Sequence, residues 1–90
     1  MTTPYGDQLA RWRVRNPIRV ARRRHGVSRQ VLAHQVGASY EGLRNLEVGR
    51  VTRQSRYLAP IAAALEDPGL PDRWETWLRA RPRLEEVPRA

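Results

Sequence analysis

The feature of this sequence that most restricts its fold is a pair of short helical segments, each with its own start and stop signal. Ser28 precedes the segment RQVLAHQV and Gly37 follows it, while Ser39 precedes YEGLRNLEV and Gly49 follows it. Serine caps the free amides of a helix start, and glycine favours the left-handed conformation that ends a helix. Only Ala38 separates the first stop from the second start. Two short helices joined by so tight a turn are typical of a helix-turn-helix.

Further signals predict helices on both sides of this pair. Asn16 and Pro17 form a cap and a first-turn residue, so a helix is expected from there to the stop at Gly26. Apolar residues at helical spacing predict another helix that starts at Ser55 or Ala59 and includes Leu65, with Pro60 either kinking it or marking its first turn. A last helix is expected from Asp72 to Arg81.

These segments predict an all-α chain, a compact bundle of four to five short helices with the helix-turn-helix at residues 28–48. Four parts are expected along the chain: an N-terminal arm or short helix at 1–15, with residues 1–6 loose and the helix beginning at Asp7; a helix-turn-helix domain at 16–66; a hinge and C-terminal helix at 67–81; and a flexible tail at 82–90.

The charge of the chain points to a polyanionic partner. The formal net charge is +8, and every one of the 17 basic residues is arginine. An excess of this size favours nucleic acid first and an anionic membrane surface second. No apolar run approaches the length of a membrane span, and the first 20 residues hold four arginines, unlike a signal peptide. We therefore expect no membrane partner and a cytoplasmic, nucleoid-associated protein.

Little in the sequence favours catalysis. There is no cysteine, which excludes disulfides, thiolate metal sites and cysteine nucleophiles. His25 and His34 are nine residues apart with no third ligand near, so metal binding is not expected. The only adjacent carboxylates, Glu66-Asp67 and Glu85-Glu86, lie next to the hinge or in the tail. We expect no enzyme, no metal and no cofactor.

Residues 18–65 resemble the Cro and phage-repressor type of helix-turn-helix domain, the XRE-like group. The resemblance rests on GVSRQVLAHQVGAS at 26–39, LRNLEVG at 43–49 and IAAAL at 61–65, which follow the order and spacing of that family without a gap. It implies a fold of the lambda-repressor-like type. It also implies that the helix at 39–48 is a recognition helix, which would lie in the major groove of double-stranded DNA.

The resemblance implies a role for each residue that matches the family pattern. The expected base-contacting residues are Tyr40, Glu41, Arg44 and Asn45. The expected phosphate-contacting residues are Ser28, Arg29, Ser39, Arg50, Arg53 and Arg56. Arg22 and Glu47 would form a structural ion pair that joins the helix after Pro17 to the end of the recognition helix. Arg29 stands where the family usually has Gln, a position that contacts phosphate and braces the first base-reading side chain.

Some of these positions have a second interpretation. The carboxylate of Glu41 could accept a hydrogen bond from cytosine N4 and so favour sites that contain cytosine. An acid at the front of a helix is also favoured by the helix dipole, whether or not it contacts DNA. Gly42 allows close approach to DNA or is simply tolerated inside its helix. Arg11, Arg13 and Arg15 either form an arm that wraps the duplex or belong to a solvated helix surface.

The C-terminal helix decides the expected assembly. Trp74, Trp77 and Leu78 form an apolar stripe that covers the core of its own chain, serves as a homodimer interface, or does both. The leading functional hypothesis is a sequence-specific, repressor-like transcriptional regulator. Two alternatives keep the fold: an interaction module, such as an antitoxin or a phage factor acting on host transcription machinery through a protein partner, and an accessory protein of DNA packaging or recombination.

Overall fold

The computed structural model describes residues 4–50 and 55–83, and every regular element in that part of the chain is helical. The elements are α1 (Pro4–Val14), α2 (Pro17–Arg24), α3 (Arg29–Val36), α4 (Tyr40–Val48), the 3₁₀ turn η1 (Ser55–Tyr57), α5 (Leu58–Ala64) and α6 (Leu70–Arg79). The predicted all-α fold class is confirmed. The helix-turn-helix corresponds to α3 and α4.

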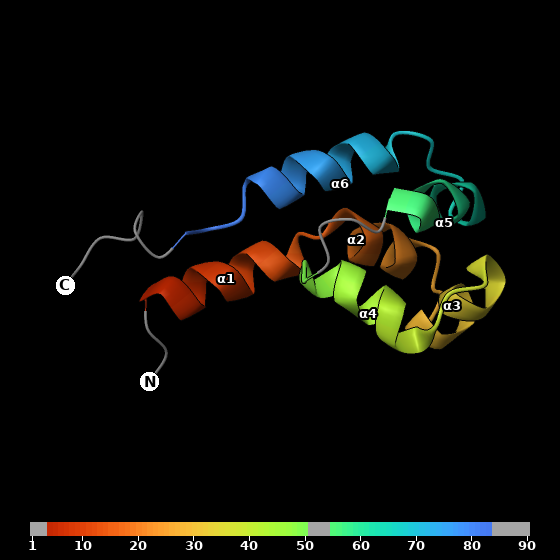
Figure 1. Ribbon diagram of the computed structural model, residues 1–90, viewed down its shortest axis with the longest axis horizontal. Helices are drawn as coiled ribbons and strands as arrows, with labels where there is room; N and C mark the ends of the chain where they lie inside the picture. The colour runs from red at the N-terminus through yellow and green to blue at the C-terminus, as the bar shows by residue number, and fades with distance from the viewer. Residues whose placement is uncertain (1–3, 51–54, 84–90) are drawn as a thin grey trace.

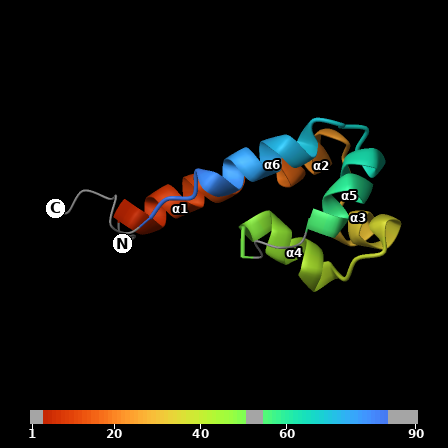
Figure 2. The same ribbon diagram turned by 45° about the horizontal axis from the view of Figure 1, so that its top comes forward.

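The helices form a bundle with an extension on one side (Figure 1). Within the bundle, α3 packs against α4 and α5, and α6 packs against α2 and α5. The first helix, α1, lies outside this group and runs antiparallel to the second half of α6, as both views show (Figures 1 and 2). The two helices nearest the ends of the chain therefore support each other beside the helix-turn-helix.

Three helices of the bundle, α2, α3 and α4, begin where the capping residues predict. Asn16 Oδ1 accepts hydrogen bonds from the amides of Ile18 and Arg19, at 2.8 and 3.3 Å. The hydroxyl of Ser28 accepts from the amide of Val31 at 3.1 Å, and that of Ser39 accepts from the amide of Gly42 at 2.9 Å. These bonds satisfy amides that have no partner inside the helix, and so they fix the first turns of α2, α3 and α4.

The turn between α3 and α4 depends on Gly37. Its φ of 72° lies in the left-handed region, and its amide reaches back to the end of α3. A residue with a Cβ resists this conformation, so the sequence ends α3 here and starts α4 after two residues. The short turn holds α4 close to α3.

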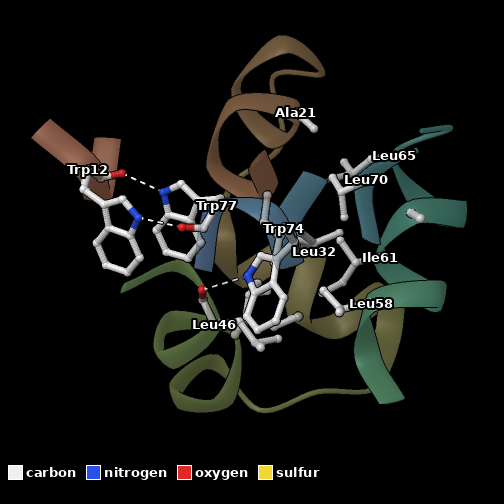
Figure 3. Close-up of a cluster of buried hydrophobic side chains, with 14 residues drawn as sticks. Trp12, Ala21, Leu32, Leu46, Leu58, Ile61, Leu65, Leu70, Trp74 and Trp77 are labelled. Atoms are coloured by element: carbon white, nitrogen blue, oxygen red, sulfur yellow. Dashed lines mark hydrogen bonds between the residues drawn. The ribbon is translucent and has the colours of Figure 1, made fainter. Parts of the chain in front are cut away.

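The core is built from aliphatic side chains of every helix in the bundle. Its fully enclosed members are Ile18, Leu32, Leu43, Leu46, Ile61, Leu65 and Leu70. Figure 3 shows the side chains of α5 and α6 meeting Leu32 and Leu46 in this cluster. Burial of such side chains contributes roughly 1.5–3 kcal/mol each, which makes this cluster the main support of the orientation of α4.

Three boundaries differ from the sequence prediction. The helix α1 begins at Pro4 and not at Asp7, so residues 4–6 are helical and not part of a loose arm. The helix α6 begins at Leu70 and ends at Arg79, two residues before each predicted end. In both helices a proline lies in the first turn, where its missing N–H costs nothing. The turn formers around these prolines therefore mark helix starts.

The stripe on α6 covers the core of its own chain. Trp74 and Trp77 are 2% and 7% exposed, and Leu78 packs against the same cluster. The interpretation of these three residues as a homodimer interface stays a prediction, since burial of the two tryptophans shows only what they contact within one chain. Large aromatic side chains need burial, and α1 supplies the missing surface through Trp12, a residue far away in the sequence.

Trp12 and Trp77 form a reciprocal contact that we call the tryptophan clasp. Their rings are stacked with centroids 3.9 Å apart and planes 2° from parallel. Each indole N–H donates to the backbone carbonyl oxygen of the other residue, at 2.8 Å in both directions (Figure 3). The N–H group of each indole thus has a hydrogen-bond acceptor inside the protein. The clasp joins the two outer helices, α1 and α6, at one point.

Candidate nucleic-acid interface

The four predicted base-contacting residues occupy one surface of α4, which we call the reading surface. Tyr40 and Glu41 are exposed in the first turn of the helix, and Arg44 and Asn45 are half-buried one turn later. The guanidinium of Arg44 lies 3.8 Å from the carboxylate of Glu41, and both side chains remain open to solvent. Such an exposed pair is weak, so either charge can turn to another partner at little cost.

The caps of α3 and α4 lie beside this surface. Ser28 and Ser39 are exposed, and each hydroxyl already accepts one hydrogen bond from its own helix. A hydroxyl that accepts can still donate, so both can reach an outside acceptor such as a phosphate oxygen. A Cβ on Gly42 would stand 3.0 Å from the Ser39 hydroxyl oxygen. The small residue therefore leaves room for the cap, a reason that the sequence did not reveal.

Glu47, near the end of α4, is buried between two arginines. Its carboxylate oxygen Oε1 lies 3.2 Å from Arg22 of α2, and its Oε2 lies 2.7 Å from Nε of Arg29 of α3. The side chain of Glu47 is only 2% exposed. A buried carboxylate needs such partners, because charge without them is costly inside a protein. The ion pair expected between Arg22 and Glu47 is present, and Arg29 adds a second one.

Arg29 is held more firmly than a free phosphate-binding arginine would be. Burial lowers the pKa of Arg29, but the hydrogen bond and charge of Glu47 outweigh this effect, and the net result is a raised pKa. The guanidinium is therefore permanently charged and already bound through one edge. Its other edge is turned toward Tyr40.

The contact between Arg29 and Tyr40 joins the ion-pair network to the reading surface. Arg29 Nη1 donates a hydrogen bond to the Tyr40 hydroxyl oxygen at 3.3 Å. The guanidinium carbon also lies 5.7 Å from the centre of the tyrosine ring, a distance at which a cation is attracted by the ring. Arg29 thus contacts the first residue of α4 at one end and Glu47, near the last, at the other.

The C-terminal end of α4 is held by donors from outside the helix-turn-helix. Asn16 Nδ2 donates to the carbonyl oxygens of Leu46 and Glu47, both at 3.0 Å, and Trp74 Nε1 donates to that of Leu46 at 3.4 Å. Carbonyls in the last turn of a helix lack the usual partner four residues on, and that of Leu46 accepts only a long bond of 3.4 Å from the amide of Gly49 besides these two donors. Asn16 is completely buried, so the residue predicted only as a cap of α2 also anchors α4. Sequence spacing gave no signal for this second role.

The tryptophan clasp closes over the residue that ends α4. Gly49 has a φ of 74°, and a Cβ at this position would overlap the ring of Trp12 and stand 3.0 Å from the ring of Trp77. The glycine is therefore required both for its backbone conformation and for lack of a side chain. The outer helices, through the clasp at Gly49 and through Trp74, and the cap of α2, through Asn16, fix the orientation of α4.

The positive charge is concentrated in the half of the chain that carries the reading surface. Residues 4–50 contain ten arginines and three acids, whereas residues 55–83 contain five arginines and four acids. Arg50 and Arg56, both predicted to contact phosphate, are exposed, and Arg56 lies 4.8 Å from the ring of Tyr57. The third arginine of this group, Arg53, lies outside the described residues.

Other kinds of site find less support. In residues 4–50 and 55–83 no group of three or more metal-binding side chains comes together. No helix in the same residues is long and apolar enough to cross a membrane. Comparison with known protein families, with curated proteins and with solved structures finds no match to this chain.

Proposed function

We propose that the protein is a sequence-specific double-stranded DNA-binding transcriptional regulator of the repressor-like kind, with α4 as the recognition helix in the major groove. The observation that carries this proposal is the exposed first turn of α4 beside the exposed caps of α3 and α4, in the half of the chain with ten arginines and three acids. Helix N-termini and arginines bind phosphates, while side chains on the front of such a helix read bases.

The resemblance to Cro and phage-repressor domains supports the same function. In that arrangement Tyr40, Glu41, Arg44 and Asn45 contact bases, and Ser28, Ser39, Arg50, Arg53 and Arg56 contact phosphate. Arg29 is reassigned by its contacts: because Glu47 binds its Nε, we propose that it supports Tyr40 and is not primarily a phosphate ligand. Nucleoid association in the cytoplasm would follow from this function.

One alternative function, an interaction module acting through the α6 stripe, loses the surface on which it depended; an accessory role in DNA packaging or recombination does not depend on that stripe. An interaction module gripping a protein partner would need an exposed stripe on α6, but Trp74 and Trp77 are buried against their own chain. The predicted homodimer rested on the same stripe. We therefore propose a DNA-binding role that a single chain can perform, with any second copy bound through another surface.

Selection of bound sequences from a random duplex library tests this proposal. The wild-type protein should recover one motif and prefer it about 10³-fold or more over random DNA at physiological salt. Arg44→Ala and Asn45→Ala should each change the motif at a different position, with Glu75→Ala on α6 as a control that changes nothing. Recovery of random sequences by the wild-type protein would refute the proposal.

A further inference from the structure

The hydroxyl of Tyr40 differs from an ordinary exposed tyrosine because one of its hydrogen-bonding roles is already taken. A phenol hydroxyl both donates and accepts, and so an unrestrained tyrosine is a poor discriminator between base edges. Here Arg29 Nη1 donates to the oxygen at 3.3 Å, which occupies the accepting side of the hydroxyl. An arginine has no acceptor, so the proton of Tyr40 cannot be directed at Arg29.

The position of Arg29 is itself fixed. Its Nε is bound at 2.7 Å by Glu47, a carboxylate buried in the protein, and the planar guanidinium keeps Nη1 at a set direction from that bond. The cation–π contact, with the guanidinium carbon 5.7 Å from the centroid of the Tyr40 ring, restrains the ring as well. Tyr40 as a residue is 47% exposed at the front of α4, so its hydroxyl proton is available to a ligand.

We propose that Arg29 makes Tyr40 a one-way hydrogen-bond donor, so that this residue selects an acceptor on the base it faces and rejects cytosine. This inference rests on the proposed function. In the major groove guanine presents two acceptors, N7 and O6, adenine presents N7 and thymine presents O4. Cytosine presents only the N4 amino group, which donates. Opposite cytosine, the Tyr40 hydroxyl and the N4 amino group would both be donors, and neither would find an acceptor. Guanine is the preferred base because its two acceptors are adjacent.

The assignment separates Tyr40 from the other members of the reading surface. Glu41 is an acceptor and Arg44 a donor, and they lie within 3.8 Å of each other on the exposed surface. Neither is tied to the buried network, so either can adjust to more than one base. Tyr40 is the member whose hydrogen-bonding direction is set by the protein before DNA arrives.

The test compares the full-length wild-type protein with Tyr40→Phe and Arg29→Lys in selection from a random duplex library, followed by affinity measurement on the selected duplex. Tyr40→Phe removes only the hydroxyl and should weaken the best site about three- to tenfold, the effect of one lost hydrogen bond. Exclusion of cytosine should disappear at one position and persist elsewhere. Arg29→Lys keeps a charge for Glu47 but lacks the fork that reaches both partners, and should relax the same position.

The outcomes are distinguishable from failure of the proposed function. A wild-type protein without any preferred motif overturns the proposed function, and the inference falls with it. A clear wild-type motif whose cytosine exclusion survives in Tyr40→Phe overturns the inference alone. Equal weakening of all sequences by Tyr40→Phe also overturns it, because the hydroxyl would then contact phosphate. Thermal unfolding of each variant shows whether the fold is retained, and Glu41→Gln provides a matched reading-surface variant that should keep the cytosine exclusion.

Discussion

At the scale of single residues, Glu47 connects the fold to the reading surface. It is a charge buried in a small protein, and two arginines from two different helices neutralise it. Replacing one partner of such a group leaves the others buried without compensation. The arginines are more exposed than the carboxylate, so water reduces part of this cost. Glu47 therefore matters for stability first, and through Arg29 it also supports Tyr40 of the reading surface.

We predict that Glu47→Gln destabilises the protein by about 1–3 kcal/mol, because the amide keeps the size of the side chain but not its charge. Urea denaturation followed by tryptophan fluorescence measures the change. Glu41→Gln is the matched control: its carboxylate is exposed and 3.8 Å from one arginine, so the free energy of unfolding should change by less than about 0.5 kcal/mol. Equal effects of the two substitutions would contradict the network.

Only part of this residue-level network could be predicted from the sequence. The pairing of Arg22 with Glu47 followed from a resemblance, and the cap at Asn16 followed from its neighbours. The contact of Arg29 with Tyr40 spans 11 residues, and the bonds of Asn16 to α4 span 30 and 31. Contacts at such separations depend on how helices pack, which periodicity within one helix does not determine.

At the scale of elements, local signals predicted helix starts well when the capping residue was a serine or an asparagine. They failed at α1 and α6, where a proline near the start made the segment resemble a loop. The apolar faces of both helices were visible in the sequence, since Trp12, Trp74 and Trp77 lie at helical spacing with their neighbours. What each face packs against was not visible, and the clasp was therefore missed.

We predict that Gly49→Ala costs more stability than Gly37→Ala, although both glycines have nearly the same φ, 74° and 72°. The left-handed conformation costs an alanine about 1–2 kcal/mol at either position. A Cβ at Gly37 meets nothing within 4 Å, whereas at Gly49 it collides with the clasp. Overpacking adds about 1–3 kcal/mol at Gly49 alone. Thermal unfolding of the two variants measures the difference, and equal midpoints would show that the clasp yields freely.

The indole hydrogen bonds of Trp12, in the clasp, and of Trp74, outside it, lead to a separate prediction. Trp12→Phe removes the donor that binds the carbonyl oxygen of Trp77 at 2.8 Å, and Trp74→Phe removes a longer bond of 3.4 Å to Leu46. Both changes shrink a buried side chain by the same amount. We therefore expect Trp12→Phe to be the more destabilising by about 0.5–1.5 kcal/mol in urea denaturation. The reverse order would mean that the stacked pair is maintained by packing alone.

At the scale of the whole molecule, the chain separates two tasks. The second half of the described chain, residues 55–83, is nearly balanced in charge and supplies the aromatic cover of the core. The first half carries the arginine excess and the reading surface. The bond from Trp74 to Leu46 of α4 and the tryptophan clasp between Trp12 and Trp77 connect the two. In the proposed function, the part of the chain with the arginine excess would supply most of the electrostatic attraction for DNA.

This asymmetry predicts how single arginines affect the salt dependence of DNA binding. Each phosphate contact releases counterions, and removal of one contact lowers the slope of log affinity against log salt concentration by about 0.9. Arg50→Gln should produce this change and weaken all DNA sequences alike, because Arg50 is exposed next to the end of α4. Arg79→Gln removes the same charge from an arginine whose side chain is 81% exposed on α6, and should leave the slope unchanged. Titrations of a fluorescent duplex at several salt concentrations separate the two cases. If both variants lower the slope equally, DNA responds to the net charge of the molecule and not to the surface around α4.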